Sequence, residues 1–151
     1  RFGGNRVRGT AHKPGYPAAT LRMGPCSIIE VEHYFDLCAD IELGANVVIG
    51  GLGSVFFTHT FHRPDFEPIR IGDDVYVGSN CRFQMGTSVA EGCVVGMGAV
   101  VVKSIETPGA LVGGVPARVV KEDAGYDAAS AFALRRRPYF RDGRVTFPEP
   151  R

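Results

Sequence analysis

The 151-residue sequence has no tryptophan, no apolar run that approaches the roughly 18 residues of a transmembrane helix, and almost no excess of either charge. With 17 basic and 16 acidic residues the net charge is +1, which gives no electrostatic basis for binding nucleic acid or an anionic membrane. No signal-peptide pattern opens the chain, so we expect a cytoplasmic protein without membrane insertion. The chain begins at Arg1 rather than methionine, which leaves an upstream segment open.

Metal-binding patterns of cysteine are also missing. The four cysteines, Cys26, Cys38, Cys81 and Cys93, form no CxxC pair and have no histidine at zinc-finger spacing. We therefore expect them to be reduced and buried, as free cysteine commonly is. Twenty glycines, by contrast, indicate a chain with many tight turns.

Aliphatic residues, with Phe83 as the one exception, recur every six positions through two stretches of the sequence. The first series is Val31, Leu37, Leu43, Ile49 and Val55; the second is Ile71, Val77, Phe83, Val89, Val95 and Val101. The residue two positions before each member is usually small or apolar. A period of six fits neither the 3.6-residue repeat of a helix nor the simple alternation of a single strand.

A chain that turns a corner every six residues explains this period. Three sides make one triangular coil of about 18 residues, and successive coils stack through parallel strands. We expect each aliphatic residue, and the residue two positions before it, to point into the prism. Glycine, asparagine and aspartate in LGANVVIGG and IGDDVYVGSN suit the corners. The prediction is an all-β solenoid over about residues 22–120 of a single 151-residue domain.

Two segments, IGDDVYVGSNCRFQMGTSVAEGCVVGMGAVVVK (71–103) and GALVGGVPARVVK (109–121), resemble the repeats and the closing motif of the hexapeptide-repeat acyltransferases. The ending is most similar to that of the maltose, galactoside and polysaccharide O-acetyltransferases, and the resemblance covers about residues 26–122. It implies a left-handed parallel β-helix, a homotrimer with active sites between the subunits, and acetyl-CoA as co-substrate without a metal.

The two six-residue series are out of phase, because Val55 and Ile71 lie 16 residues apart. A segment between them must leave the prism, and we expect it to project as a loop over about residues 58–68. Pro64 and Pro68 suit a loop better than a buried side of the prism. A long loop on a rigid solenoid is a favourable place for function.

The loop carries the only close pair of histidines in the sequence, His59 and His62. A neutral imidazole has an unperturbed pKa of about 6.5 and can take the proton of a hydroxyl that attacks a thioester, so no covalent intermediate is needed. The loop sequence HTFHRPDF resembles the H-D-Y-x-D-P-x-F loop of polysaccharide acetyltransferases, which implies that His59 is the base. His62 is the alternative base, and otherwise His62 and Phe61 are expected to contact the acceptor.

Zinc is the rival use for histidines on such a scaffold. The β-helical carbonic anhydrases need three histidine ligands, two of them downstream of the first. No histidine follows His62 in this sequence, so one chain does not supply such a site.

The resemblance assigns further residues, each with a structural alternative. Ser79 is expected to help hold the developing oxyanion and Asn46 to reach the acceptor, although either can be a plain corner residue. The residues expected to bind coenzyme A are Tyr76, Gly78, Gly98, Ala99, Lys103, Gly114, Pro116, Arg118 and Lys121. The alternatives are packing for Tyr76 and ordinary surface charge for the cations.

Residues 123–137 read as a short helix with alanines and a basic end stopped by Pro138. Taken together, the sequence predicts transfer of an acetyl group from acetyl-CoA to a hydroxyl of a sugar or polysaccharide unit. The alternatives are N-acetylation of an amino sugar, O-acetylation of a xenobiotic, and a non-catalytic β-helical scaffold. The acceptor, the acyl chain length and the role of Arg135–Arg137 stay open.

Overall fold

The computed structural model describes residues 19–60, 62, 65–128, 139–141 and 144–146. The first two coils contain β1 (Leu21–Met23), β2 (Ile28–Val31), β3 (Tyr34–Phe35), β4 (Ile41–Leu43), β5 (Val48–Leu52) and β6 (Val55–Phe56). The next two contain β7 (Ile69–Ile71), β8 (Tyr76–Val77), β9 (Arg82–Phe83), β10 (Ser88–Val89), β11 (Val94–Val95) and β12 (Val100–Val101). The remaining strands are β13 (Leu111–Gly113), β14 (Arg118–Lys121), β15 (Tyr139–Arg141) and β16 (Arg144–Thr146).

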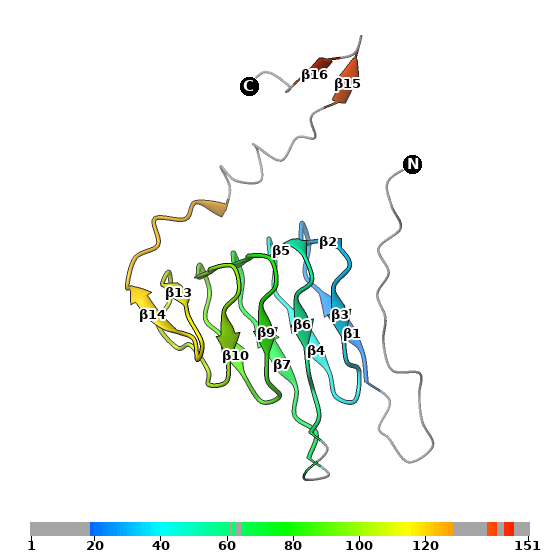
Figure 1. Ribbon diagram of the computed structural model, residues 1–151, viewed down its shortest axis with the longest axis vertical. Helices are drawn as coiled ribbons and strands as arrows, with labels where there is room; N and C mark the ends of the chain where they lie inside the picture. Colours follow the sequence, from blue (N-terminus) through cyan, green and yellow to red (C-terminus); the bar gives the residue numbers. More distant parts are fainter. Residues whose placement is uncertain (1–18, 61, 63–64, 129–138, 142–143, 147–151) are drawn as a thin grey trace.

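Strands β1 to β13 wind into a three-sided solenoid, one strand per side (Figure 1). The three sheets have the orders β1-β4-β7-β10, β14-β13-β11-β8-β5-β2 and β12-β9-β6-β3. Their strands pair in parallel, except that β14 folds back antiparallel on β13 at the C-terminal end. The predicted parallel β-helix is therefore confirmed. The strands β15 and β16 pair antiparallel with each other.

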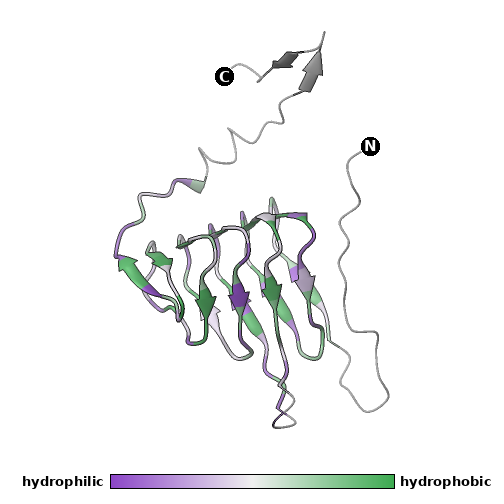
Figure 2. Ribbon diagram, in the orientation of Figure 1, coloured by the Kyte–Doolittle hydropathy of each residue, from purple (hydrophilic) through white to green (hydrophobic). Residues whose placement is uncertain are grey.

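The interior of the third and fourth coils follows the predicted period. All six members of the second series are buried, as are the residues two positions before them: Ile69, Val75, Cys81, Thr87, Cys93 and Ala99. Three stacked rows of apolar side chains run along the prism, and Figure 2 shows hydrophobic residues along most of the strands. The six-residue repeat produces these inward rows, because strand alternation sends positions two apart to the same side of the sheet.

In the first two coils the predicted inward positions are partly wrong. Val31 is 43% exposed, and Phe56 rather than Val55 fills the interior of β6. The pairing of β2 with β5 shifts register between Ile29 and Val31. Gly51 within β5 and Gly53 in the connection to β6 both have positive φ. A slip of one residue in a strand sends every following side chain to the opposite face.

One edge of the prism is a column of left-handed corner residues. Cys26, Asn46, Asp74, Gly92 and Gly109, one from each coil, have φ between 55° and 70°. The corners are also joined by side chains, since Asn46 Nδ2 donates to Asp74 Oδ1 at 3.0 Å. Cys26 is exposed at this edge, so the expectation of burial is wrong for Cys26 and correct for the other three cysteines, and all four are free thiols.

The predicted loop leaves the solenoid between β6 and β7 and protrudes beyond it (Figure 1). Its base is closed by an antiparallel bridge between His59 and Phe66 and by a hydrogen bond from Glu67 N to Thr58 O at 3.1 Å. The inserted loop lengthens the coil that carries it. Ile41 therefore pairs with Ile69 on the far side of the loop, whereas in the next coil Arg70 pairs with Ser88 only 18 positions later.

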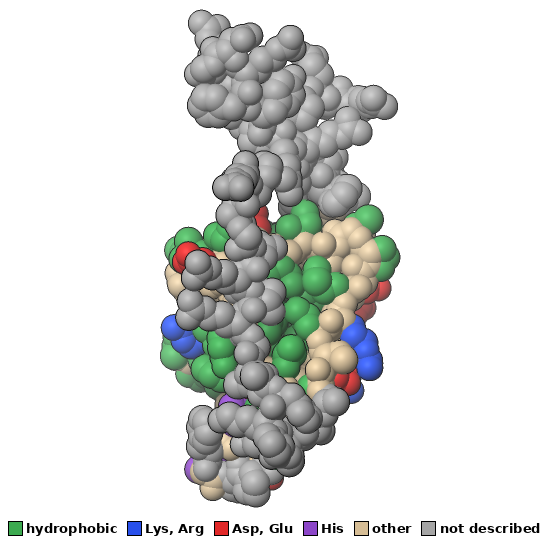
Figure 3. Space-filling model, turned by 90° about the vertical axis from the view of Figure 1, so that its right-hand side faces the viewer, with side chains coloured by type: hydrophobic (Ala, Val, Ile, Leu, Met, Phe, Trp, Pro, Cys, Tyr) green, Lys and Arg blue, Asp and Glu red, His purple; other side chains and the backbone are tan. Residues whose placement is uncertain are grey.

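The C-terminal helix predicted for residues 123–137 lies mostly outside the described residues. Residues 123–127 are described and have no regular secondary structure. No helix among the residues described is long and apolar enough to span a membrane. At the other end of the solenoid β1, β2 and β3 are the outermost strands of their sheets, and hydrophobic side chains occupy much of the face seen there (Figure 3).

Candidate active site

The base of the loop lies directly beside the turn that follows β3. Parallel pairing aligns Phe35 with Phe56, and Asp36 N donates to Phe56 O at 2.9 Å. The rings of Phe35 and Phe56 stack with centroids 4.7 Å apart, and Phe83 continues the stack at 4.5 Å from Phe56. This packed column fixes the depth at which the chain segments after β3 and β6 leave the core.

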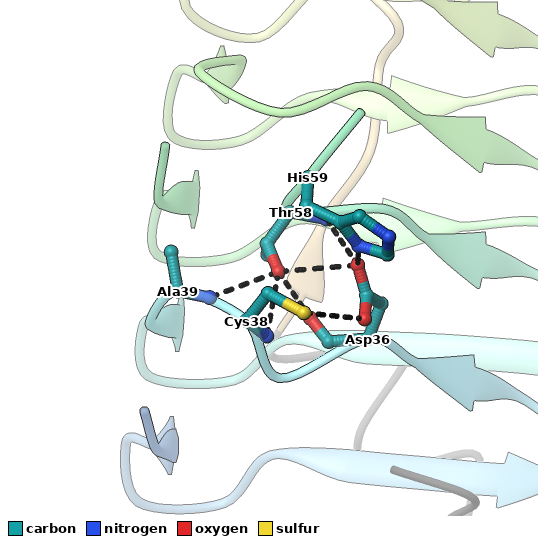
Figure 4. A network of polar contacts seen from close by, with 5 residues as sticks. All are labelled: Asp36, Cys38, Ala39, Thr58 and His59. Carbon is teal, nitrogen blue, oxygen red and sulfur yellow. Dashed lines mark hydrogen bonds and ion pairs between the residues drawn. The ribbon is translucent and has the colours of Figure 1, made fainter. Parts of the chain in front are cut away.

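A histidine–aspartate pair forms at this point (Figure 4). His59 Nδ1 contacts Asp36 Oδ2 in a short hydrogen bond or ion pair. The side chain of Asp36 is fully buried and that of His59 is 10% exposed. The two residues come from consecutive coils, so the β-helix itself brings them together.

The Asp36 carboxylate is surrounded by hydrogen-bond donors. Besides His59, the thiol of Cys38 donates to Oδ1 at 3.3 Å and the Thr58 backbone N–H donates to Oδ2 at 3.1 Å. Burial alone raises the pKa of Asp36, but the hydrogen bonds from His59, Cys38 and Thr58 outweigh it and the pKa lies below its ordinary value. Asp36 is therefore an ionised, buried acceptor.

Thr58 holds the turn after β3 in place. Its Oγ1 accepts the backbone N–H groups of Cys38 at 3.1 Å and Ala39 at 3.0 Å, and it donates to the backbone oxygen of Asp36. All of these contacts are drawn in Figure 4. One threonine thus satisfies three backbone groups that would otherwise be buried without partners.

The charge state of Asp36 fixes the tautomer of His59. An ionised carboxylate only accepts hydrogen bonds, so the proton between the two groups belongs to His59 Nδ1. In the neutral ring Nε2 then carries the basic lone pair. The arrangement provides an imidazole that can take a proton at Nε2 while a buried negative charge stabilises the resulting cation.

A pocket of about 300 Å³ opens beside His59, over the outer face of the sheet β12-β9-β6-β3. Its walls are formed by Phe57, His59, Arg82, Phe83, Gln84, Val100 and Val102. The lining is apolar apart from the imidazole, one guanidinium and one amide. This volume is at the small end of the range for small-molecule sites, which suits one sugar ring or one short arm of a larger ligand.

Asp36, Cys38 and His59 also offer oxygen, sulfur and nitrogen donors within 4.8 Å of one another, a set chemically suited to a zinc-like ion. In the structure, however, these three side chains are hydrogen-bonded to one another. An ion here would have to displace the Cys38 thiol proton and the Nδ1 proton of His59. The present arrangement is instead that of a supported base.

The structure places the other predicted catalytic and acceptor residues apart from this pocket within one chain. Ser79 lies at the corner before β9, whereas His59 follows the adjacent parallel strand β6. The two residues therefore lie beyond opposite ends of the strands of this sheet. Ser79 Oγ accepts the backbone N–H of Leu52 at 3.4 Å. Asn46 lies at the corner between β4 and β5, where it bonds Asp74. His62 contacts Thr60, and Phe61 lies outside the described residues.

The residues predicted to bind coenzyme A fall into three groups. Most gather on the corner that carries Ser79: Gly78, Gly98, Ala99, Gly114 and Pro116. Tyr76 lies on β8, with its ring centroid 6.0 Å from that of Tyr126. Arg118 and Lys121 belong to the exposed strand β14, and the exposed Lys103 follows β12.

Asp36 and Arg82 are the site residues that the sequence analysis missed. The sequence did not indicate that Asp36 contacts His59. The two residues are 23 positions apart, and in coils of irregular length such a spacing does not predict which residues stack. The one signal for Asp36 is its place directly after Phe35, a predicted inward residue. Arg82 follows the inward Cys81 at an outward position of the repeat, where the sequence pattern carries no signal of a site residue.

Comparison with known proteins supports the resemblance to the hexapeptide-repeat acyltransferases. Residues 68–103 match the hexapeptide repeat of succinyl-transferase. A hexapeptide-repeat-containing acetyltransferase from Vibrio cholerae O1 biovar eltor, solved as a complex with acetyl-coenzyme A, is 31% identical with a TM-score of 0.62. The similarity covers 68% of this chain and 60% of that one. A maltose O-acetyltransferase from Clostridium difficile 630 has a TM-score of 0.62 at 21% identity, over 78% of this chain and 69% of its own.

Among curated proteins, a 2,3,4,5-tetrahydropyridine-2,6-dicarboxylate N-acetyltransferase of Staphylococcus aureus is 32% identical over 83 residues. The match covers 55% of this chain, and the chain spans about a third (31%) of the length of that relative. The resemblance of this chain to the hexapeptide-repeat acyltransferases is thereby confirmed, and with it the left-handed sense of the parallel β-helix.

Proposed function

We propose that this chain, a hexapeptide-repeat acyltransferase in fold and repeat, transfers an acetyl group from acetyl-CoA to a hydroxyl of a sugar or polysaccharide unit. The observation that carries the proposal is the bond from His59 Nδ1 to the buried Asp36 in the wall of a pocket. A similar protein of known structure holds acetyl-coenzyme A, which supports acetyl-CoA as the donor.

The pair supports direct transfer without a covalent enzyme intermediate. The acceptor oxygen attacks the thioester carbonyl while His59 Nε2 takes its proton. Asp36 lowers the energy of the imidazolium that forms, as the carboxylate does in a catalytic triad. The carbonyl oxygen becomes the oxyanion of a tetrahedral intermediate. When this intermediate collapses, the carbon–sulfur bond breaks and the imidazolium returns the proton to the departing thiolate of coenzyme A.

Ser79 and the predicted coenzyme residues enter this scheme through a second copy of the chain. Ser79 and His59 lie beyond opposite ends of the strands of one sheet. We therefore place the thioester between His59 of one subunit and Ser79 of its neighbour in a homotrimer. Ser79 would then donate to the oxyanion. Gly98 suits a close approach of the pantetheine arm, since a Cβ at this position would meet no atom within 4 Å.

An amine acceptor is the second candidate, favoured by the name of the 32% identical Staphylococcus aureus relative, an N-acetyltransferase. The same base serves either acceptor, because an ammonium group must also lose a proton before it attacks. An acceptor series of matched alcohols and amines, such as glucose and glucosamine, decides between O- and N-transfer.

The test is the release of coenzyme A thiol by the wild-type protein and by His59→Gln. We expect the variant to lose roughly 100-fold or more of kcat, the scale of a general base, while calorimetry shows that it still binds coenzyme A. Arg22→Gln serves as the surface control and should keep most of the activity, as should wild type after EDTA. His62→Gln tests the alternative base and should keep most of kcat. If wild type neither binds coenzyme A nor turns over acetyl-CoA, the scaffold alternative replaces the proposed function.

A further inference from the structure

The pocket beside His59 contains one positive side chain and no acidic one among the residues that line it. The positive group is Arg82 on β9, which Figure 2 colours as a strongly hydrophilic strand. Its partners at the same level of the sheet are Val55 on β6 and Val100 on β12. A single arginine therefore interrupts an apolar surface next to the imidazole.

The guanidinium of Arg82 has donors to spare. One of its N–H groups donates to the backbone oxygen of Asn80 at 3.0 Å, and a guanidinium has five such donors. Arg82 is exposed, and it takes part in none of the ion pairs found within the described part of the chain. By contrast, Arg22 and Arg70 on the neighbouring sheet both pair with Glu42, at 3.3 Å and 3.1 Å.

The rest of the pocket suits a sugar ring. Phe57, 44% exposed, offers an aromatic face, Val100 and Val102 offer apolar surface, and Gln84 offers an amide for hydroxyl groups. The planar fork of Arg82 matches a carboxylate in a two-point hydrogen bond. The phosphates of coenzyme A do not suit this place, because the whole pantetheine arm separates them from the thioester that must meet His59.

We infer that the acceptor is a sugar unit bearing a carboxylate, held by Arg82 so that one of its hydroxyls faces Nε2 of His59. This inference rests on the proposed function and narrows its substrate class from sugars in general to acidic sugars. The positive charge also favours approach of an anionic glycan, an effect that added salt weakens.

The probes are methyl β-D-glucuronide and methyl β-D-glucoside, which differ in a carboxylate against a hydroxymethyl group. Their binding is measured by NMR titration at neutral pH, with coenzyme A present, for wild type, Arg82→Gln, Arg82→Lys and the matched surface control Arg22→Gln. We expect wild type and Arg22→Gln to prefer the glucuronide by roughly 10- to 100-fold, the scale of hydrogen bonds to a charged group. Arg82→Gln should abolish the preference and Arg82→Lys should retain part of it.

Three results overturn the inference while the proposed function stands. These are equal binding of the two probes by wild type, binding of neither, and a preference that survives in Arg82→Gln. If Arg82→Gln instead weakens acetyl-CoA binding and leaves the preference intact, Arg82 serves the coenzyme and the inference is also wrong. Failure of the proposed function is seen separately, as loss of acetyl-CoA binding and turnover in wild type.

Discussion

In the third and fourth coils, strand partners lie 18 residues apart, as Tyr76 and Val94 do, whereas Ile28 of the first coil pairs with Val48 of the second, 20 positions later. The regular half buries almost only apolar side chains. The irregular half contains four of the five buried polar residues of the described chain: His33, Asp36, Ser54 and Thr58, with Thr87 the fifth. Extra residues in a coil leave backbone groups without ladder partners, and these buried polar side chains supply the missing hydrogen bonds. The comparison shows a regular half that acts as a rigid template and an irregular half that holds the chemical groups.

The Phe35–Phe56–Phe83 stack joins the two halves, and breaking it gives the largest expected effect on stability. Phe56→Ala removes the fully buried central ring and should lower the free energy of unfolding by about 3–5 kcal/mol. Urea denaturation followed by circular dichroism measures this. Phe57→Ala, at the exposed neighbouring position, is the control and should change stability by less than about 1 kcal/mol. Equal effects would mean that the stack does not couple the halves.

Asp36→Asn tests whether the irregular half positions the base. The amide neither stabilises a protonated His59 nor fixes the same tautomer, so kcat should fall by roughly 100-fold or more. Coenzyme A binding should be unchanged. A variant that merely unfolds would lose coenzyme binding as well, and unaltered kcat would remove Asp36 from the mechanism.

His33 gives the smallest effect, a dependence of stability on pH. Its Nδ1 accepts the Ser54 backbone N–H at 3.1 Å, and its buried Nε2 has no partner in the described chain. Burial lowers the pKa of His33 below 6.5, against the opposing charge of Glu30. The unfolded chain therefore binds the proton more readily. The stability from neutral His33 is fully present above pH 6.5 and is lost as the pH falls below it.

The slope from this one group is at most about 1.4 kcal/mol per pH unit. Thermal unfolding between pH 7 and 5 should show it in wild type and in the control His62→Gln, whose histidine is exposed. His33→Gln, which keeps an acceptor for Ser54, should flatten the curve. An unchanged slope in His33→Gln would assign the pH dependence to another group.

Sequence periodicity was a reliable guide where each coil has 18 residues. The inward rows from Ile69 to Val101 were predicted because alternation and corner spacing leave only one register there. The protruding loop was predicted from the same period, because the 16 residues between Val55 and Ile71 are not a multiple of six. The register around Val31 and Val55 was wrong, since the shifts near Gly51 and Gly53 depend on backbone conformations that the period does not encode.

The three-sided solenoid and the position of His59 on a loop at its side can be predicted from the sequence, because a repeat of six residues and a break in that repeat are local patterns. The partner of His59, in contrast, is known only from the folded chain. Asp36 meets His59 because parallel pairing of β3 with β6 stacks two turns whose separation varies with each inserted residue. The pocket has the same origin, since Arg82 and Val100 come beside His59 from successive coils. Stacking of coils joins residues across chain distances that no local pattern specifies.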